Sequence, residues 1–487
     1  MKMKNKEKRK IVISAAEPDY ENFEYLPRDM IDKGIIINEN GNNSIAYPHK
    51  LKKCREFLNG NRISTWYEYV PAQIAPPEKR ALVISLHGGL MEGWGQAVYS
   101  TWTKIAEREG CIAVFPDAGI RKMWMIDYDR SMEDILTAEN ESGVYLNKNP
   151  RDINENEDVK MLLALIEHVL KKYEISQNRV YIHGMSMGAL MASMMARYFG
   201  NIFAGAAFSG ALASPLLLYE KDGSLINKGG KIPVCQSHME LDQMNPGAGV
   251  PVAEVIAKNR KYWLRINECN PVPRISVRGQ NNIAYYSGKA DYIFREVKNR
   301  DHGQTIDEAE KVWNFWSHTS KIEDESLCIG DEMSVAFAEG CGMAFAEGKK
   351  EKLVSEPFYW TKYMFHGQNG NRIARGKSLM VSVNDLCRFF HAEIIKDEDQ
   401  KEMWIQLQDG REIEFAQGNI ACVIDNSIKA MTIEAVRHNE MLYISCEWFA
   451  GEVMNCFFTE CEGVIYITDH YAELSQNMAY LIKELLN

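Results

Sequence analysis

The segment Val180–Leu190, with the sequence VYIHGMSMGAL, constrains the fold of this chain more than any other. An apolar run typical of a buried strand leads into the pattern G-x-S-x-G at Gly184, Ser186 and Gly188, and an Ala- and Met-rich helical run follows. This context predicts a tight strand-to-helix turn that holds the serine in a strained conformation, with glycines that let the helix pack closely. The alternative is a Gly-rich turn with a solvated serine. We predict that Ser186 is a nucleophile at a helix N-terminus, where the dipole favours developing negative charge.

A second apolar run, Ala81–Leu86, is followed directly by His-Gly-Gly. Loops of this kind supply backbone N–H groups to an oxyanion hole, and the residue after the nucleophile supplies another. Glycine suits such a loop because the backbone itself must approach the substrate oxygen. The alternative is a simple strand-ending turn. We predict that the oxyanion hole is built from the backbone of Gly88, Gly89, Leu90 and Met187.

Downstream of Ser186, the predicted strand Ile232–Gln236 is followed by Asp242. In folds with this kind of turn, the triad acid follows the serine in the chain and the histidine comes last. Asp242 lies a few residues past the strand end, where it would fix a histidine tautomer and stabilise the imidazolium. Glu240 is the alternative acid, and a solvated loop carboxylate is the alternative role for Asp242.

His302 is the predicted general base. It lies between the last predicted strand, Tyr292–Val297, and a helical run. From there it would take the Ser186 proton and later return it to the leaving group. The other histidines considered are His238 and His318, which compete for this role, and His183, which its apolar surroundings mark as a core residue.

Short apolar runs alternate with amphipathic runs between about residues 61 and 320. This alternation is typical of βαβ units and predicts an α/β fold with a mostly parallel sheet flanked by helices. The clearest helical run is Glu157–Tyr173, whose apolar residues recur at spacings of three and four. Further strands are predicted at Trp66–Val70, Cys111–Phe115 and Ala204–Ser209, and further helices at Gly188–Tyr198 and Ile306–Thr319.

Changes in composition divide the chain into four parts. Residues 1–60 are polar and irregular and are interpreted as an N-terminal extension, and residues 61–325 as the catalytic domain. A repeated AFAEG sequence with clustered glycines predicts a linker and connecting segment over residues 326–375. Residues 376–487 contain a weak duplication, in which MVSV leads to FFHAEI and LYIS leads to WFAGEV. It predicts a smaller α+β module of two similar units.

Composition also limits the class of protein. The chain has 487 residues, 46% of them hydrophobic, so two domains are expected. The net charge of -11 argues against nucleic acid or an anionic membrane as the main partner. The 11 cysteines include no CxxC pair, which favours buried thiols in a reducing compartment over disulfides or zinc. No signal peptide or membrane-length apolar run is visible, so a soluble cytoplasmic protein is expected; a secreted chain trimmed of its leader would look the same.

At these motifs the chain resembles the polyhydroxybutyrate depolymerase and feruloyl or acetylxylan esterase group, which is similar to carbohydrate esterase family 1. The matching stretches are WYEYVP at 66–71, SLHGG at 85–89, residues 106–116, RVYIHGMSMG at 179–188 and DHG at 301–303. The resemblance implies an α/β-hydrolase fold, ester cleavage through an acyl-enzyme and no metal or organic cofactor. It also implies a triad of Ser186, Asp242 and His302. One departure is His238-Met239, where relatives usually carry His-Gly.

The duplicated module is similar to the repeat called the copper amine oxidase N-terminal-like domain. The name does not imply copper, because His366, His391 and His438 have no ligand spacing. The module is interpreted as a binding or packing domain and not as a second active site.

The predicted function is a serine esterase that acts on feruloyl or acetyl esters of plant polysaccharide fragments, or on short hydroxyalkanoate esters. Trp94 and Trp124 follow predicted strands and are expected to contact such a substrate, with core packing as the alternative. A serine peptidase acting on small peptides would share the fold and the triad, and an inactive carbohydrate-binding protein is a third alternative. The sequence leaves open the acyl and alcohol specificity, the oligomeric state and the choice between Asp242 and Glu240.

Overall fold

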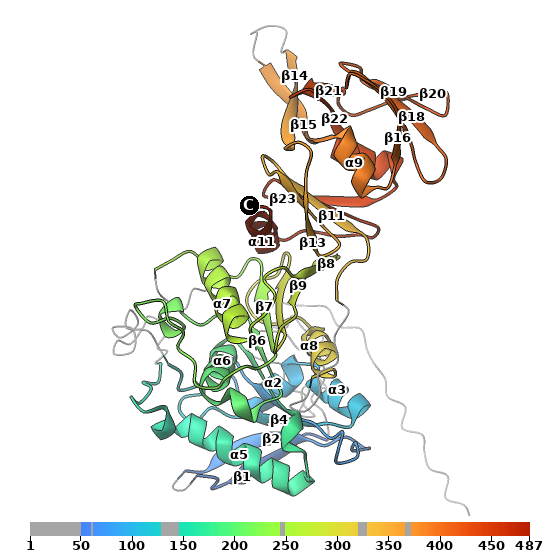
Figure 1. Cartoon of the computed structure of the whole chain (residues 1–487). Helices are drawn as coiled ribbons and strands as arrows, with labels where there is room; N and C mark the ends of the chain where they lie inside the picture. The colour runs from blue at the N-terminus through green and yellow to red at the C-terminus, as the bar shows by residue number, and fades with distance from the viewer. Residues whose placement is uncertain (1–49, 60–61, 128–145, 244–248, 320–328, 366–371) are drawn as a thin grey trace, which may run out of the picture. The chain divides into compact units, whose positions relative to one another are not determined.

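The computed structural model of the protein describes residues 50–59, 62–127, 146–243, 249–319, 329–365 and 372–487 (Figure 1). These residues form two compact units. The first contains the described residues up to 232 together with 303–319, and the second contains 233–243, 249–302 and 329–487. The predicted N-terminal extension, residues 1–60, lies outside the described residues except for 50–59, which include strand β1 (Lys52–Glu56).

The first unit is built on a sheet with the strand order β1-β2-β4-β3-β5-β6. Strands β3 to β6 are parallel, and β1 and β2 continue the sheet in antiparallel pairing. All residues of β3 to β6 are buried, as expected for parallel strands covered by helices on both faces. This architecture confirms the predicted α/β fold.

The strands that follow β1 are β2 (Ser64–Tyr69), β3 (Leu82–Leu86), β4 (Ile112–Pro116), β5 (Val180–Met185) and β6 (Gly205–Ser209). The α-helices are α2 (Gly93–Tyr99), α3 (Trp102–Glu109), α5 (Glu157–Tyr173), α6 (Met187–Phe199) and α8 (Glu308–Trp316). Short 3-10 helices lie at η2 (Ile153–Glu155), η3 (Gln177–Arg179), η4 (Gly200–Ile202) and η5 (Pro215–Leu217).

Helix α5 has the bounds that the sequence predicts, and its end signals explain why. The side chain of Asn156 accepts hydrogen bonds from the backbone N–H groups of Asp158 and Val159, both at 2.9 Å. This cap satisfies two of the N–H groups that a helix start leaves without an internal partner. The helix ends at Tyr173, and the cap residue that follows it, Glu174, adopts a left-handed conformation with φ of 49°.

In the second unit, four strands form the order β7-β10-β9-β8. Strands β7 and β10 are parallel, whereas β9 and β8 pair in antiparallel fashion. The bounds are β7 (Val234–Met239), β8 (Arg274–Arg278), β9 (Asn281–Tyr286) and β10 (Tyr292–Val297), with helix α7 (Val252–Ile266) after β7. The sequence assigned this region to the catalytic domain, whereas its contacts group it with residues 329–487.

The rest of the second unit consists of three antiparallel sheets, in the orders β13-β12-β11-β24-β23, β14-β15-β22-β21 and β16-β17-β18-β19-β20. One hydrophobic core joins them, with fully buried residues from each sheet such as Phe337, Leu379 and Ile405. The strands are β11 (Ser334–Ala338), β12 (Met343–Ala346), β13 (Lys349–Lys352), β14 (Phe358–Phe365), β15 (Arg372–Ser382), β16 (Glu393–Glu398), β17 (Glu402–Gln406), β18 (Glu412–Ala416), β19 (Ala421–Ile424), β20 (Ser427–Ala430), β21 (Val436–His438), β22 (Met441–Ser445), β23 (Phe457–Cys461) and β24 (Val464–Thr468). The helices are α9 (Val383–Phe389), α10 (Cys446–Trp448), the π-helix η6 (Phe449–Val453) and α11 (Gln476–Leu486).

The predicted linker over residues 326–375 is wrong for its described part, which contains strands β11 to β14. The apolar residues of the AFAEG repeats are buried except for the partly buried Ala346, and Phe337 and Phe345 are fully buried. Gly340 and Gly348 have positive φ values of 69° and 79°. They form turns between strands, where only glycine adopts this conformation without strain. Turn glycines therefore produced the pattern that suggested a linker.

The predicted duplication corresponds to two strand–helix–strand units, β15-α9-β16 and β22-α10-η6-β23. Ser382 caps the first helix and Ser445 caps the second. Strands β15 and β22 pair so that Val381 lies opposite Ile444, and the two copies meet around this pair in an approximately two-fold arrangement. The aromatic pairs of the two copies are not equivalent, because Phe389 ends α9 whereas Trp448 lies three residues after its cap. The resemblance to copper amine oxidase N-terminal-like repeats stays a prediction.

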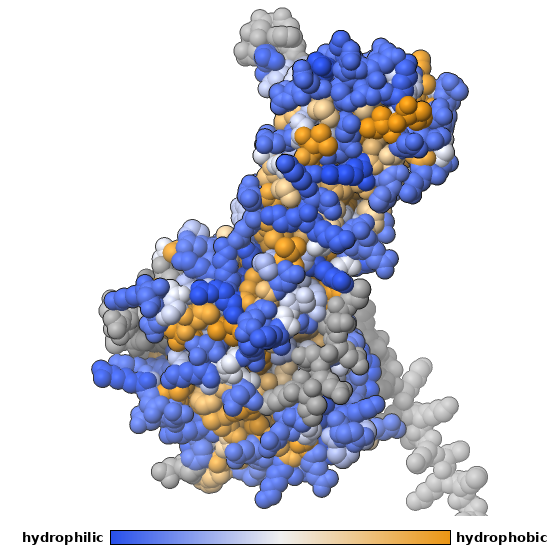
Figure 2. All heavy atoms as spheres, viewed as in Figure 1, coloured by the Kyte–Doolittle hydropathy of each residue, from blue (hydrophilic) through white to orange (hydrophobic). Residues whose placement is uncertain are grey.

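The visible surface of both units is mostly hydrophilic, with apolar residues in separate patches (Figure 2). Among the described residues, no helix has both the length and the apolar character needed to cross a bilayer.

Candidate active site

Ser186 occupies a sharp turn between β5 and α6, with φ of 55° and ψ of −119°. A side chain at Gly184 would place its Cβ 2.0 Å from the carbonyl oxygen of Gly188. A Cβ at Gly188 would lie 2.3 Å from the carbonyl oxygen of Leu86. Both distances are far below van der Waals contact, so both glycines of the motif are needed for the close packing of strand and helix. The backbone N–H of Ser186 donates to the carbonyl of Ser209 at 2.9 Å, which fixes the turn against β6.

The loop after β3 lies against this turn. A Cβ at Gly89 would lie 3.2 Å from Cγ of Met187, so the backbone of residue 89 and the start of α6 are close neighbours. Within the described part of the chain, no backbone carbonyl accepts the N–H of Gly89 or of Met187. Leu90 differs, because its N–H donates to the carbonyl of Lys122 at 3.0 Å. The prediction of Leu90 as an oxyanion donor is therefore wrong. Gly88, Gly89 and Met187 stay predicted donors, and the last two are close neighbours.

His87 braces this loop, a role that the sequence did not indicate. Its Nδ1 lies 2.6 Å from the carbonyl oxygen of Gly88, and its Nε2 lies 2.9 Å from the backbone N–H of Ala118. Because a carbonyl only accepts and an N–H only donates, Nδ1 carries the proton and Nε2 accepts. Burial lowers the pKa of His87 to about 4, so the ring is neutral at neutral pH, as this arrangement requires.

Trp124 supports the same loop from behind. It is fully buried, and its Nε1–H donates to the carbonyl of His87 at 2.8 Å. This burial corrects the expectation that Trp124 contacts substrate, and favours the packing alternative. Trp94 is half-buried at the start of α2, where its Nε1–H donates to Glu92 at 2.7 Å, and its role as a substrate contact stays a prediction.

Asp242 and His302 lie together in the second unit, just beyond the ends of the parallel strands β7 and β10. Oδ2 of Asp242 is 2.8 Å from Nδ1 of His302. The carboxylate side chain is 5% exposed and the imidazole 29%, so the acid is shielded while the base keeps an open side. Neighbouring parallel strands end at the same sheet edge, which brings the two loops together despite their separation in sequence.

The competing acid and base have other partners. The carboxylate of Glu240 accepts the backbone N–H groups of Asn299 at 3.0 Å and Gln476 at 2.9 Å. His238 is buried, and its Nδ1 lies 2.9 Å from the carboxylate of Glu296. Of the alternatives that the sequence left open, the structure therefore pairs Asp242, and not Glu240, with His302.

The two other histidines considered from the sequence lie elsewhere. His183 is buried on β5, with Nδ1 accepting from Trp102 at 3.1 Å, and burial lowers its pKa to about 4. It is a core residue, as its apolar surroundings predict. His318 lies two residues past the end of α8, partly exposed.

The chain that follows His302 returns to the first unit beside the serine turn. A Cβ at Gly210 would lie 2.5 Å from the carbonyl oxygen of Gly303. Gly210 directly follows Ser209, whose carbonyl accepts the N–H of Ser186. The N–H of Gln304 lies 3.5 Å from the hydroxyl of Tyr99, which packs with Met185, the residue before the serine. Residues 303 and 304 are therefore neighbours of the turn.

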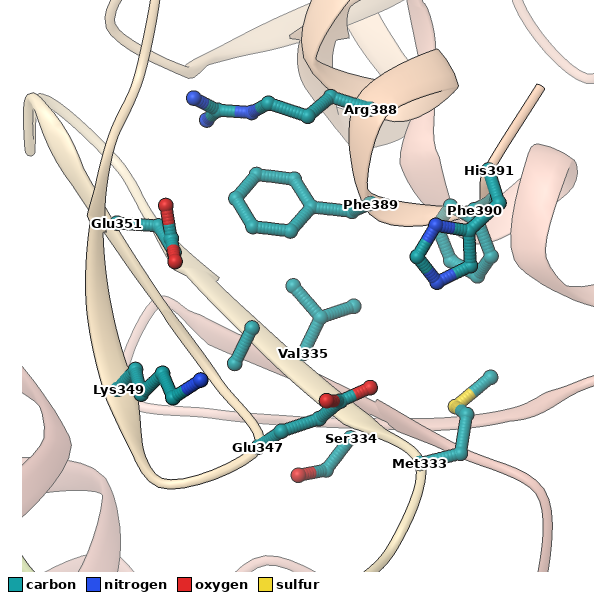
Figure 3. A pocket seen from close by; sticks show the side chains of 11 residues that line it. Met333, Ser334, Val335, Glu347, Lys349, Glu351, Arg388, Phe389, Phe390 and His391 are labelled. Atoms are coloured by element: carbon teal, nitrogen blue, oxygen red, sulfur yellow. The ribbon is translucent and has the colours of Figure 1, made fainter.

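A separate surface cavity of about 200 Å³ lies in the second unit, between strands β11 to β13 and the end of α9 (Figure 3). Figure 3 shows its labelled lining, which includes Glu347, Lys349, Glu351, Arg388, Phe389 and His391. The guanidinium of Arg388 lies 4.6 Å from the ring centre of Phe389. An aromatic ring among charged groups is compatible with a binding role for the module, which stays a prediction. The described residues hold no cluster of three or more His, Cys, Asp or Glu side chains suited to a metal ion.

Comparison with known proteins shows what part of the chain is similar to. Residues 72–261 match the family described as phospholipase/carboxylesterase. Acetylxylan esterase A of Emericella nidulans is 28% identical over 169 residues, which cover 34% of this chain and 48% of that protein. Feruloyl esterase B of Talaromyces stipitatus is 28% identical over 148 residues, which cover 30% of this chain and 35% of that protein. The chain thus spans about half the length, or less, of these relatives.

Among solved structures, an acetyl xylan esterase from Aspergillus awamori aligns with a TM-score of 0.41 at 14% identity, over 55% of this chain and 98% of that one. The segment matched by the family contains the serine turn, the loop after β3 and Asp242, while His302 lies beyond it. The predicted resemblance to the esterase group is confirmed. The chain therefore carries, over residues 72–261, an α/β-hydrolase unit that matches the phospholipase/carboxylesterase family and is similar to the acetylxylan and feruloyl esterases.

Proposed function

We propose that this protein is a serine carboxylic-ester hydrolase, in which Ser186 attacks the ester carbonyl and His302 and Asp242 complete the triad. The observation that supports this most strongly is the strained serine turn, with φ of 55° at Ser186, beside the backbone amides of Gly89 and Met187. A serine without a catalytic role has no need of such a conformation, which costs on the order of 1–3 kcal/mol.

The acid–base pair supplies the proton transfers that this reaction needs. The carboxylate of Asp242 accepts from Nδ1–H of His302, which leaves Nε2 free of its proton. Nε2 then takes the proton of the Ser186 hydroxyl as the oxygen attacks the carbonyl carbon, and Asp242 stabilises the imidazolium. The N–H groups of Gly89 and Met187 hold the negative oxygen of the tetrahedral intermediate. Collapse expels the alcohol, protonated by the imidazolium, and water cleaves the acyl-enzyme by the same steps.

Chain connectivity also favours the triad. His302 is bonded to Gly303, and residues 303 and 304 lie beside Gly210 and Tyr99, which both neighbour the serine turn. The chain therefore joins His302 directly to residues that lie beside the serine turn, which favours His302 as the base for Ser186. We therefore assign the base to His302 and not to His238, whose Nδ1 is committed to the buried Glu296.

The substrate class we propose is feruloyl or acetyl esters of plant polysaccharide fragments, or short hydroxyalkanoate esters. The names of the relatives, acetylxylan esterase A and feruloyl esterase B, support the first of these. Turnover of acetylated xylo-oligosaccharides, feruloylated sugars and hydroxybutyrate esters by the purified protein would rank them. A peptide amide assayed in parallel tests the peptidase alternative, and turnover of none of these by folded protein favours the inactive binding protein.

The first test is Ser186→Ala. Loss of the nucleophile should lower kcat for p-nitrophenyl acetate by roughly 10⁴- to 10⁶-fold. Ser193→Ala is the matched control, because Ser193 is a buried serine on the same helix α6. Activity of the Ser186 variant close to that of the control would rule out the proposed mechanism.

The second test compares the two acids. Asp242→Asn should lower kcat by about 10⁴-fold, because the amide favours the wrong tautomer of the histidine. Glu240→Gln should have a much smaller effect, since Glu240 binds backbone amides and not the imidazole. If Glu240→Gln is the more damaging change, the assignment of Asp242 as the triad acid is wrong.

A further inference from the structure

Helix α11, near the C-terminal end of the chain, begins against carboxylates of the hydrolase strands. The backbone N–H of Gln476 donates to Oε1 of Glu240, and the backbone N–H of Asn477 donates to Oε2 of Glu296, each at 2.9 Å. The residue before the helix, Ser475, makes no side-chain cap of its own. The N–H groups that a helix start leaves unpaired are thus satisfied by two acidic side chains more than 180 residues earlier in the chain, with favourable helix-dipole interactions.

Glu240 joins this helix to both loops of the acid–base pair. Its second oxygen, Oε2, accepts the backbone N–H of Asn299 at 3.0 Å. Glu240 lies two residues before Asp242, and Asn299 lies three residues before His302. One carboxylate therefore connects the acid loop, the base loop and the start of α11.

Glu296 forms a second connection, which is fully buried. It lies opposite His238 in the parallel pairing of β10 and β7, and the two side chains are 2.9 Å apart. The side-chain amide of Asn477 donates to the same carboxylate at 2.6 Å. Burial opposes ionisation of Glu296, but the hydrogen bonds from His238 and Asn477 outweigh it and hold its pKa below the usual value. Because two of its donors come from residue 477, this buried charge depends on the helix.

The helix is also held along its length. Glu484 forms ion pairs with Arg260 and Lys261 of α7, and Met478 and Ile482 are fully buried. Contacts join α11 to α7 and β9 as well as to β11, β12 and β24 of the C-terminal sheets. A change at the start of α11 is therefore not absorbed by free movement of the helix.

We propose that α11 is a positioning element for the active site, which sets the relative placement of Asp242 and His302 through the carboxylates of Glu240 and Glu296. The proposal assumes the triad named above. It gives the C-terminal module a part in the reaction, beyond any binding role: the backbone amide of Gln476 is the positioning group, and it touches neither substrate nor reacting atoms.

The test removes a single N–H group. Gln476 is the first residue of α11, a position where proline is well tolerated, and Ser475 before it is already extended with φ of −86° and ψ of 161°. Gln476→Pro therefore deletes the donor to Glu240 while keeping the helix. Gln476→Ala is the matched control, because it removes the same side chain, with its bonds to Glu462 and Tyr480, but keeps the N–H.

We expect kcat for p-nitrophenyl acetate to be about 10-fold lower in the proline variant than in the alanine variant, with KM alike and with equal urea midpoints. A merely structural role would instead lower the midpoint and leave the kcat of the folded fraction unchanged. Equal kcat in the two variants would overturn the proposal, whereas failure of the proposed function itself would appear as no turnover by the wild-type protein.

Glu240→Gln combined with Gln476→Pro gives a second measurement. If the two substitutions act through the same hydrogen bond, kcat of the double variant should be no lower than that of the more damaging single variant. If the fold-losses in kcat of the two single variants multiply in the double variant, Glu240 and Gln476 do not act through one hydrogen bond. Should the proline variant fail to fold, Asn477→Ala replaces it, since that change removes only the amide donor to Glu296. Wild-type kcat in this variant would then count against the proposal.

Discussion

At Gly188 the serine turn leaves no room for a side chain. Its built Cβ would lie 2.3 Å from the carbonyl oxygen of Leu86 and 2.6 Å from that of His87. These are backbone atoms at the end of β3 and the start of the loop that carries the proposed oxyanion amide of Gly89, so they cannot move without moving the candidate site. A methyl group at residue 188 must therefore push the serine turn away from the loop after β3.

Gly188→Ala should accordingly lower kcat by at least 100-fold and destabilise the first unit by about 1–3 kcal/mol, the usual cost of overpacking. Gly95→Ala is a suitable comparison, because the Cβ built at that helical glycine meets nothing closer than 3.5 Å. There alanine should leave kcat intact and raise stability by roughly 0.5–1 kcal/mol. Steady-state kinetics and urea denaturation of the two variants measure both quantities, and a fully active Gly188→Ala enzyme would refute this view of the turn.

Single residues also show how far the sequence could predict the site. Ser186, Asp242 and His302 follow from chain order and from their places after predicted strands, which are local signals. The brace formed by His87 does not, because Ala118 comes within reach of its ring only when β3 and β4 are in register. The same is true of Leu90, whose amide is occupied by Lys122. Local patterns locate the side chains, while the hydrogen-bond partners depend on tertiary packing.

At the level of elements, the two capped helices of the C-terminal module are the repeated feature. Oγ of Ser382 lies 3.1 Å from the N–H of Asp385, and Oγ of Ser445 lies 3.1 Å from the N–H of Trp448. Each cap is the last residue of the strand that pairs with the other copy. The strand periodicity and the aromatic pairs suggested the repeat, but the serines are the positions that the two copies share.

Ser382→Ala and Ser445→Ala should therefore each destabilise the second unit by about 1–2 kcal/mol, since each removes an N-cap. Ser427→Ala, at an exposed strand position in β20, should change stability little. Urea denaturation of the three variants gives the comparison. Equal costs at all three positions would show that the caps contribute nothing specific.

At the level of the whole molecule, buried histidines make stability depend on pH. Burial lowers the pKa of His183 to about 4 from its ordinary 6.5. Between these values the unfolded chain binds a proton that the folded chain does not, so acidification through this window favours unfolding. His183→Asn removes this contribution. The loss of unfolding free energy between pH 7 and pH 5 should then be smaller in the variant, by about 2 kcal/mol. An identical pH dependence in urea titrations of both proteins would contradict the assignment of a neutral core histidine.

The division of the chain is where sequence and structure differ most. The change in composition near residue 325 suggested that the catalytic domain ends there, yet residues 233–243 and 249–302 pack with residues 329–487. The contacts responsible, such as Glu240 with Gln476 and Arg260 with Glu484, join residues 236 and 224 positions apart. Neither periodicity nor composition carries information about pairs so distant, whereas the parallel strands of the first unit follow from local alternation.

The link between α11 and the strands β7 and β10 also orders events during synthesis of the protein. The ribosome completes Glu240 and Asp242 well before it reaches Gln476, 236 residues after Glu240. At ordinary rates of translation this gap lasts roughly 10–50 s. During that time the nascent chain lacks the amides that fasten the loops of Asp242 and His302, so under the positioning role proposed above full activity would be reached only once residues 476 and 477 are in place. Polypeptides released before that point would retain a serine without a correctly seated proton acceptor.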